Sequence, residues 1–193
     1  MHIPGGRVLS DLSADGRLSL GTVGWDRDDW LSGYYPADLP PEWRPAYYAN
    51  DCGCVLLKAE SWCRADSDTL AESLDELGGR LLIFLEQPVA ESSGVWSNLS
   101  LFAECRAVLL VDRPDPRQAH LPQWVAQGDG VWVDSESDAG LVRWSVDTMN
   151  LRELRARADA LQETVRALVL DGPAASPAAV PELRTMLELM GIA

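Results

Sequence analysis

The sequence predicts an α/β fold built around a parallel sheet. Short runs of almost uninterrupted apolar residues alternate along the chain with segments whose apolar residues recur at helical spacing. Strands of this kind are buried on both faces, which is typical of parallel sheets, and their alternation with helices favours right-handed βαβ units. A length of 193 residues with 47% hydrophobic residues is enough for a sizeable core. We therefore expect one domain over residues 1–193.

Seven strands are predicted from the apolar runs. The first run ends in Leu-Gly-Thr-Val-Gly-Trp at residues 20–25, where two glycines allow a tight turn and a close approach of neighbouring groups. Trp25 then lies at the C-terminal end of the strand, where ligand sites gather in parallel α/β proteins. The predicted strands are 18–24, 54–60, 80–86, 107–112, 130–134, 141–146 and 165–171.

Helices are expected between most of these strands. The clearest spans 67–78, where either Asp66 or Ser67 can cap the first turn and leucines share one face. Gly78 and Gly79 end this helix. The predicted helices are 41–50, 67–78, 117–127, 151–163 and 177–190.

Composition and charge exclude several classes of function. With 30 acidic and 16 basic residues the net charge is -14, which repels a phosphate backbone, so no nucleic-acid partner is expected. Residues 1–6 carry no basic region that leads into an apolar stretch, and no later apolar run is long enough to span a bilayer. We predict an acidic, cytoplasmic protein that does not bind membranes.

The four cysteines do not match a zinc site. Cys52, Cys54 and Cys63 lie close together in the sequence, but structural zinc sites use two pairs of ligands, and no second pair exists here. Buried free thiols in a reducing compartment explain them better, together with Cys105. Neither a metal nor a cofactor is expected.

A set of small and aromatic residues near the start of the chain is typical of one protein family. They are Gly21, Thr22, Gly24, Trp25, Trp30, Tyr35, Pro36, Leu39, Pro40, Tyr47, Tyr48 and Ala49. This stretch resembles the opening of the YecE-like proteins, also called domain of unknown function 72. The similarity continues in the same order at 86–88, 112–114, 141–144 and 170–172. The resemblance implies a (β/α) barrel similar to a TIM barrel, and it implies no reaction, because the activity of the family is not established.

The chain is short for such a barrel. A complete eight-stranded barrel typically takes about 250 residues, whereas this chain has 193 and about seven visible strands. The shortening falls between the strands at 107–112 and 141–146. We therefore predict an incomplete or shortened parallel barrel, whose open edge is covered by a protein partner or by a second copy of the chain.

Departures from the family predict a swapped ion pair. Alternate residues of the strand at 54–60 share a face, and in the family this face lines the barrel interior. Leu56 and Lys58 replace a glutamate and an asparagine of the family there, and Glu86 replaces a lysine at the end of the next strand. Lys58 is expected to face the interior and to pair with Glu86 or with Glu60.

Two histidines of the family are also missing. Their positions are Pro114 and Ser145-Val146, and the remaining His2 and His120 belong to no recognisable triad. Histidine is the side chain that titrates unperturbed near neutral pH, so its loss removes the usual agent of acid-base catalysis. The remaining candidates for catalysis are Lys58, Glu60 and Glu86. The alternative is that the two carboxylates only neutralise the lysine.

A small anion is the predicted ligand of the barrel mouth. Arg113 and Arg143 end or occupy neighbouring strands, and their planar guanidinium groups suit a carboxylate or a phosphate. Trp25 offers an indole for stacking on a planar ring or a sugar.

Aspartates at strand ends complete the set of ligand-binding candidates. Asp134 and Asp171 each close an apolar strand, as does Asp112. One possibility is that aspartates pair with the two arginines and leave no vacancy for a ligand. Others are that they cap the following loops, or that they form an oxygen-rich metal site with Glu86. Of the last two we favour capping.

Two classes of function remain. The first is a divergent YecE-like domain that is catalytically silent and binds a small anion or a protein partner, which the missing histidines favour. The second is an enzyme that acts on a small phosphorylated or carboxylated substrate by acid-base chemistry at the barrel mouth. The two differ in whether Lys58, Glu86, Arg113 and Arg143 converge on an open pocket.

Overall fold

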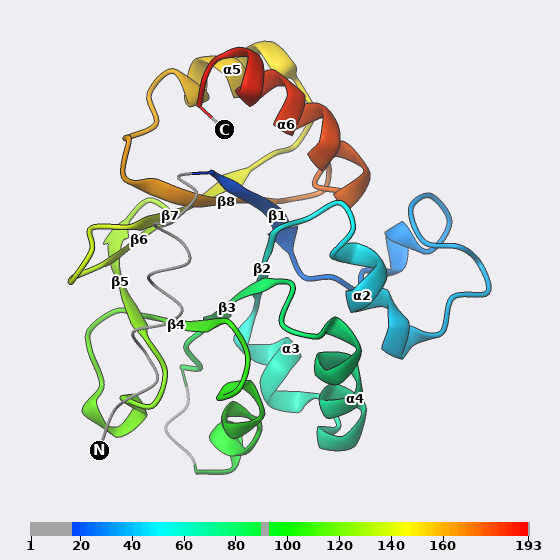
Figure 1. Ribbon diagram of the computed structural model, residues 1–193, viewed down its shortest axis with the longest axis vertical. Helices are drawn as coiled ribbons and strands as arrows, with labels where there is room; N and C mark the ends of the chain where they lie inside the picture. Colours follow the sequence, from blue (N-terminus) through cyan, green and yellow to red (C-terminus); the bar gives the residue numbers. More distant parts are fainter. Residues whose placement is uncertain (1–16, 90–92, 193) are drawn as a thin grey trace.

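Eight strands form a closed barrel in which the spatial order follows the sequence (Figure 1). The computed structural model describes residues 17–89 and 93–192. Seven strands run in one direction, and β6 runs antiparallel to both of its neighbours. The strands are β1 Ser19–Val23, β2 Cys54–Leu57, β3 Leu82–Glu86, β4 Ala107–Val111, β5 Gln123–Gly128, β6 Val131–Asp134, β7 Gly140–Ser145 and β8 Val165–Asp171.

The barrel corrects three expectations. It has eight strands where seven were predicted, it is closed where an opening was expected, and it is mixed where a purely parallel sheet was expected. The physical reason is that an antiparallel hairpin needs a turn of only a few residues, whereas a parallel connection needs a crossover of a dozen or more. The closed barrel has no open edge for a partner to cover, so a partner on any other face stays a prediction.

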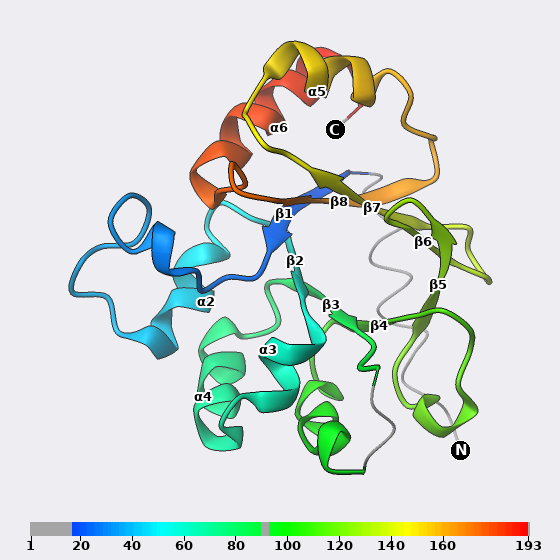
Figure 2. The same ribbon diagram turned by 180° about the vertical axis from the view of Figure 1, so that it is seen from behind.

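Helices cover only part of the barrel. Figure 1 and Figure 2 show α5 and α6 on the side of β7, β8 and β1, and α2, α3 and α4 on the side of β1, β2 and β3. Among the described residues, the only helical segment between β4 and β7 is the short 3-10 turn Pro116–Gln118. The α-helices are α2 Arg44–Tyr48, α3 Ala59–Arg64, α4 Ser67–Leu77, α5 Leu151–Ala158 and α6 Val180–Leu189, and the longest 3-10 segment is Ser93–Phe102.

The helix predicted at 117–127 is wrong, because most of this segment forms β5. Trp124 and Val125 on this strand point to opposite faces of the barrel wall and pack in its inner and outer cores. The Gln123 side chain also accepts the Asp115 N–H at 2.7 Å and donates to the Asp115 carbonyl at 2.8 Å. The pairing of this segment with β4 and β6 decides its conformation and outweighs its local propensity.

The helix expected at 67–78 is confirmed as α4. Of the two possible caps, Asp66 is the one used, because its carboxylate accepts the Thr69 N–H at 3.0 Å. Gly78 ends the helix in a left-handed conformation at φ 59°. The helices at 151–163 and 177–190 are confirmed with shorter bounds, as α5 and α6.

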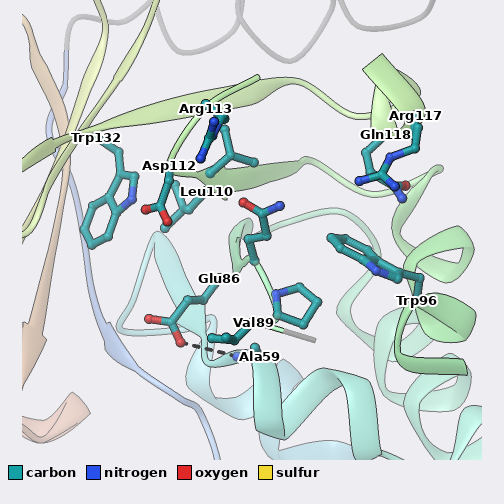
Figure 3. Close-up of a pocket in the computed structure, with 13 residues that line it drawn as sticks. Ala59, Glu86, Val89, Trp96, Leu110, Asp112, Arg113, Arg117, Gln118 and Trp132 are labelled. Atoms are coloured by element: carbon teal, nitrogen blue, oxygen red, sulfur yellow. Dashed lines mark hydrogen bonds between the residues drawn. The ribbon is translucent and has the colours of Figure 1, made fainter. Parts of the chain in front are cut away.

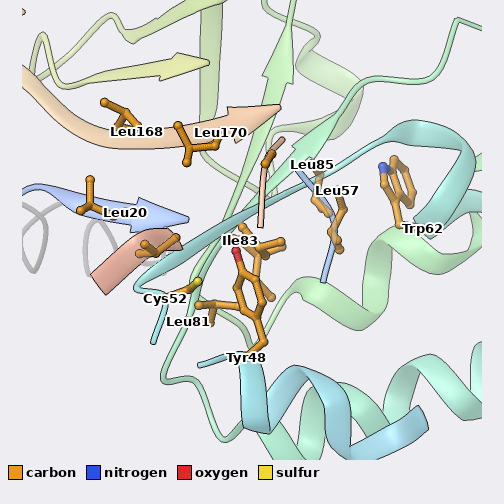
Figure 4. Packing of buried hydrophobic residues seen from close by; sticks show 14 of the residues in the cluster. Leu20, Tyr48, Cys52, Leu57, Trp62, Leu81, Ile83, Leu85, Leu168 and Leu170 are labelled. Atoms are coloured by element: carbon orange, nitrogen blue, oxygen red, sulfur yellow. The ribbon is translucent and has the colours of Figure 1, made fainter. Parts of the chain in front are cut away.

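Two layers of core hold the barrel together. The inner layer fills the barrel with side chains such as Leu56, Phe84 and Trp124. The outer layer lies between the strands and the helices, and Figure 4 shows part of it around Tyr48 and Ile83. Strands that contribute to both layers must be apolar on both faces, which is why they read as uninterrupted hydrophobic runs.

The seam between β1 and β2 is bridged by a side chain. The Tyr48 hydroxyl, from α2, accepts the Thr22 N–H at 2.7 Å and donates to the Cys54 carbonyl at 3.0 Å. Gly21 lies against the same carbonyl, and a Cβ at this position would come within 1.8 Å of the Cys54 oxygen. The expected close approach at the first glycine is therefore confirmed. Gly24, at φ 77°, then makes the turn.

The strand predicted at 54–60 ends earlier than expected. β2 stops at Leu57, and helix α3 begins at Ala59. The buried Trp62 side chain explains the early helix, because its indole N–H donates to the Glu86 carbonyl at 3.1 Å.

Within the described residues, no helix is both long and apolar enough to cross a membrane.

Candidate functional site

A pocket opens at the C-terminal ends of β3 and β4, where sites occur in barrels of this kind. We call it the mouth pocket, and its volume is about 890 Å³. In Figure 3, Trp132 and Asp112 lie on one side, Trp96 and Arg117 on the opposite side, and Glu86 between them near Ala59. The lining residues are Ala59, Glu86, Gln87, Pro88, Val89, Trp96, Leu110, Val111, Asp112, Arg113, Arg117, Gln118 and Trp132.

Glu86 occupies the last position of β3. It follows the inward-facing Phe84 by two residues, so its side chain enters the barrel mouth. One carboxylate oxygen lies 3.7 Å from the Arg143 guanidinium, and the other accepts the Ala59 N–H at 3.4 Å. The Glu86 and Arg143 side chains are 36% and 31% exposed, so the pair is screened by water and is weak.

Arg143 and Trp132 form the second half of this cluster. Arg143 follows the inward-facing Leu141 on β7, and its guanidinium lies 5.4 Å from the centroid of the Trp132 ring. Trp132 reaches the inner core from β6. No sequence pattern marked Trp132 as a residue of the site. The strand that contains Trp132 was predicted correctly. Local patterns could not predict that this strand pairs with β7, which brings Arg143 beside Trp132.

Within the described residues, the rim of the mouth pocket carries one cation, Arg113, that has no partner. Asp112 and Arg113 follow β4, line the pocket and are exposed. Among the residues that the structure describes, the Arg113 guanidinium makes neither an ion pair nor a hydrogen bond. Within the described part of the chain, Arg113 is therefore not paired with an aspartate, contrary to one of the possibilities raised by the sequence.

The opposite wall is polar and already internally paired. Arg117 forms a two-pronged contact with Asp115, with the shorter distance between side-chain atoms at 2.9 Å. This hydrogen bonding lowers the pKa of the Asp115 carboxyl below its usual range. Gln118 and Trp96 line the same wall. This wall offers an indole and an amide to a ligand, and in its ion pair Arg117 is exposed while Asp115 is largely covered.

The predicted ion pair of Lys58 is wrong. Lys58 sits at the start of α3 and not within β2, and Glu60 is an exposed residue of that helix. The carboxylate of Glu86 faces Arg143 instead. The early end of β2 causes this difference, because the alternation of a strand no longer applies after Leu57. In the described chain neither Lys58 nor Glu60 lines the mouth pocket.

The other candidate residues lie elsewhere. Trp25 follows β1 but lines a separate groove beside α3 and α4. Asp134 ends β6, which runs antiparallel, so it lies near the N-terminal end of β7, away from the mouth. There its carboxylate accepts the Ser137 N–H at 3.0 Å. Asp171 ends β8 and accepts the Gly172 N–H at 2.8 Å, so both aspartates stabilise turns.

The remaining titratable groups form no cluster in the described residues. No group of three or more histidine, cysteine or acidic side chains there is arranged to hold a metal ion. All four cysteines are free thiols, and burial raises the pKa of Cys52 to about 12 and that of Cys63 to about 11. His120 is exposed, and His2 lies outside the described residues.

The architecture is similar to that of a solved DUF72 family protein from Thermotoga maritima. The superposition has a TM-score of 0.50 and 13% sequence identity, and it covers 89% of this chain and 99% of that chain. The two chains share a fold. The predicted resemblance to the DUF72, or YecE-like, proteins is thus confirmed at the level of architecture. No family model matches the sequence, and no curated protein matches it.

Proposed function

We propose that this chain is a binding domain whose mouth pocket holds a small organic anion with a planar body. The observation that carries the proposal is Arg113, a pocket-lining guanidinium without a partner in the described residues. A guanidinium presents a planar fork of donors that matches a carboxylate or a phosphate. The volume of about 890 Å³ lies within the range of about 300–1,000 Å³ that ligand pockets occupy.

The planar body follows from the two indoles. Trp132 and Trp96 lie on opposite sides of the mouth pocket, with Arg113 at its rim (Figure 3). An aromatic or sugar ring packs well against indole faces. Glu86 and Asp112 place negative charge in the same pocket, which limits the ligand to a single anionic group directed toward Arg113. Arg143, the other arginine predicted to hold the anion, does not line the pocket, and it acts on the site only through its contact with Glu86.

The proposal includes binding without turnover. An acid-base mechanism needs a titratable group within hydrogen-bond reach of the reacting atoms. Of the three candidates for catalysis, Glu86 alone lines the pocket. The Glu86 carboxylate instead contacts the Arg143 guanidinium and the Ala59 N–H. The pocket therefore supports recognition better than catalysis.

Calorimetric titration with benzoate, acetate and phosphate tests the proposal. Benzoate should bind more tightly than acetate, because only benzoate has a ring to stack. Replacing Arg113 by alanine should weaken benzoate binding about tenfold, the loss expected for one charge-assisted contact. Arg155→Ala is the matched control, because Arg155 is an exposed arginine of α5 outside the pocket.

Glu86→Gln separates binding from catalysis. It removes a negative charge from the pocket and releases Arg143, so benzoate should bind more tightly to the variant. In an acid-base enzyme the same change removes the proton carrier and abolishes turnover. Equal loss of affinity in Arg113→Ala and Arg155→Ala, or no binding by the wild type, contradicts the proposed site.

A further inference from the structure

A second cavity lies outside the barrel, between the loop that follows β1 and the helices α3 and α4. We call it the outer groove, and its volume is about 330 Å³. We propose that the outer groove binds a small organic amine with an apolar body. This proposal does not depend on the mouth pocket. The lining residues are Trp25, Asp26, Pro41, Leu57, Ser61, Trp62, Ala65, Asp66, Thr69, Leu70 and Ser73.

The walls of the outer groove are apolar and well supported. Leu57, Trp62 and Leu70 are buried and pack in the outer core. Trp25 is half-buried, and its backbone carbonyl accepts a hydrogen bond from the Tyr35 hydroxyl, which holds the loop in place. A wall of this kind is suited to a branched alkyl or aromatic body.

The polar groups of the outer groove favour a cation. Its lining includes the carboxylates of Asp26 and Asp66 and the hydroxyls of Ser61, Thr69 and Ser73. None of the lining residues is a lysine, an arginine or a histidine. The mouth pocket, in contrast, is lined by two arginines. The outer groove and the mouth pocket therefore favour ligands of opposite charge.

Asp66 supplies the charge that recognises the amine. Its carboxylate accepts two hydrogen bonds from Thr69, from the backbone N–H and from the hydroxyl, both at 3.0 Å and both to Oδ1. These bonds lower the pKa of Asp66, which keeps the group ionised at neutral pH. A carboxylate has about four acceptor positions, so it retains capacity for an ammonium donor.

The charge balance of the two carboxylates in the outer groove predicts how many positive charges the ligand carries. Asp26 is paired with Arg44, which lies outside the lining of the groove, so its charge is balanced within the protein. One unbalanced carboxylate then remains, which matches a ligand with a single positive charge. The indole of Trp25 adds a favourable surface for an ammonium group through cation–π attraction.

The probe for this site is 3-methylbutylamine, compared with its neutral and anionic counterparts 3-methylbutanol and 3-methylbutanoate. Binding is followed by calorimetry and by chemical-shift changes of the tryptophan indole N–H groups. The amine should bind saturably and shift the Trp25 signal, which Trp25→Leu identifies. The alcohol should bind about tenfold more weakly or worse, because it lacks the charge-assisted contact.

Asp66→Asn is the decisive variant, because asparagine is also a good helix cap and preserves α4. This variant should bind the amine about tenfold more weakly than the wild type does. Asp68→Asn is the matched control, since Asp68 is an exposed acid of the same helical turn that does not line the groove. An equal loss in both variants means that the amine responds only to the net charge of the chain, and this overturns the proposal. Equal binding of the amine and the alcohol to the wild type overturns it without any variant.

Discussion

The barrel is closed in two different ways, at the seam between β1 and β2 and at the hairpin of β5 and β6. The seam joins two parallel strands, and the Tyr48 hydroxyl bridges their backbones inside the protein. The hairpin joins two antiparallel strands by a tight turn in which Asp129 and Gly130 both have positive φ, at 50° and 74°. In the described chain no α-helix lies between β4 and β7 to cover the hairpin.

Stability is more concentrated at the seam than at the hairpin. The seam depends on a few contacts from distant parts of the chain, and the groups that make them are buried, so a lost hydrogen bond is costly. The hairpin depends on turn geometry and on partly exposed side chains, which water can solvate after a change. Matched substitutions at the two places should therefore have very different costs.

The largest effect is expected for Gly21→Ala at the seam. The new methyl would lie 1.8 Å from the Cys54 oxygen, so β1 and β2 must move apart. We expect a loss of at least about 4 kcal/mol in the free energy of unfolding, measured by urea denaturation. Gly53→Ala is the control, because its nearest neighbour would be an ordinary 3.6 Å away, and it should change stability by less than about 1 kcal/mol. Similar losses in both variants would show that the close approach is not what limits the seam.

A smaller loss is expected for Tyr48→Phe. The change removes the hydroxyl that satisfies one backbone N–H and one carbonyl in the buried seam. Leaving both unpaired should cost about 3 kcal/mol. Tyr47→Phe serves as the control on the same helix, because the described structure shows no hydrogen bond from its hydroxyl, and its melting temperature should stay near that of the wild type.

The hairpin should respond more weakly to the same kind of change. Gly130→Ala places a methyl 3.0 Å from the Arg143 oxygen at φ 74°. We expect a loss of about 1–2 kcal/mol, because the left-handed conformation disfavours alanine and the partly exposed turn can relax. Gly33→Ala, which meets no atom within 4 Å, should be nearly neutral in the same denaturation assay. A loss at Gly130 as large as that at Gly21 contradicts the contrast between the two regions.

The smallest expected effect is the acid response of α4, which packs against α2 on the seam side. Hydrogen bonds from Thr69 lower the folded-state pKa of Asp66 below its unfolded value. Its contribution to stability is therefore present above the unfolded pKa of about 4, and is lost as pH falls through the folded pKa. Melting temperatures of the wild type and of Asp66→Asn should converge as the pH is lowered. If the difference between the two melting temperatures does not change with pH, the titration of Asp66 does not contribute to stability.

Much of the architecture could be predicted from the sequence alone. Apolar runs predicted the positions of seven strands, because a strand buried on both faces has no room for polar residues. Local chemistry also predicted α4 with its cap and its terminal glycine, since capping involves residues only a few positions apart. The close approach at Gly21 was predicted from the residue type, because glycine has no side chain to prevent such a contact.

The closure of the barrel and the side chains that meet at its mouth depend on contacts between distant parts of the chain. β5 carries no strong local signal of a strand, and it becomes one because β4 and β6 offer unpaired backbone groups on both sides. The meeting of Glu86, Arg143 and Trp132 depends on the antiparallel direction of β6 and on the early end of β2. These features are set by pairings between residues far apart in the chain, and local sequence patterns carry no information about such pairings.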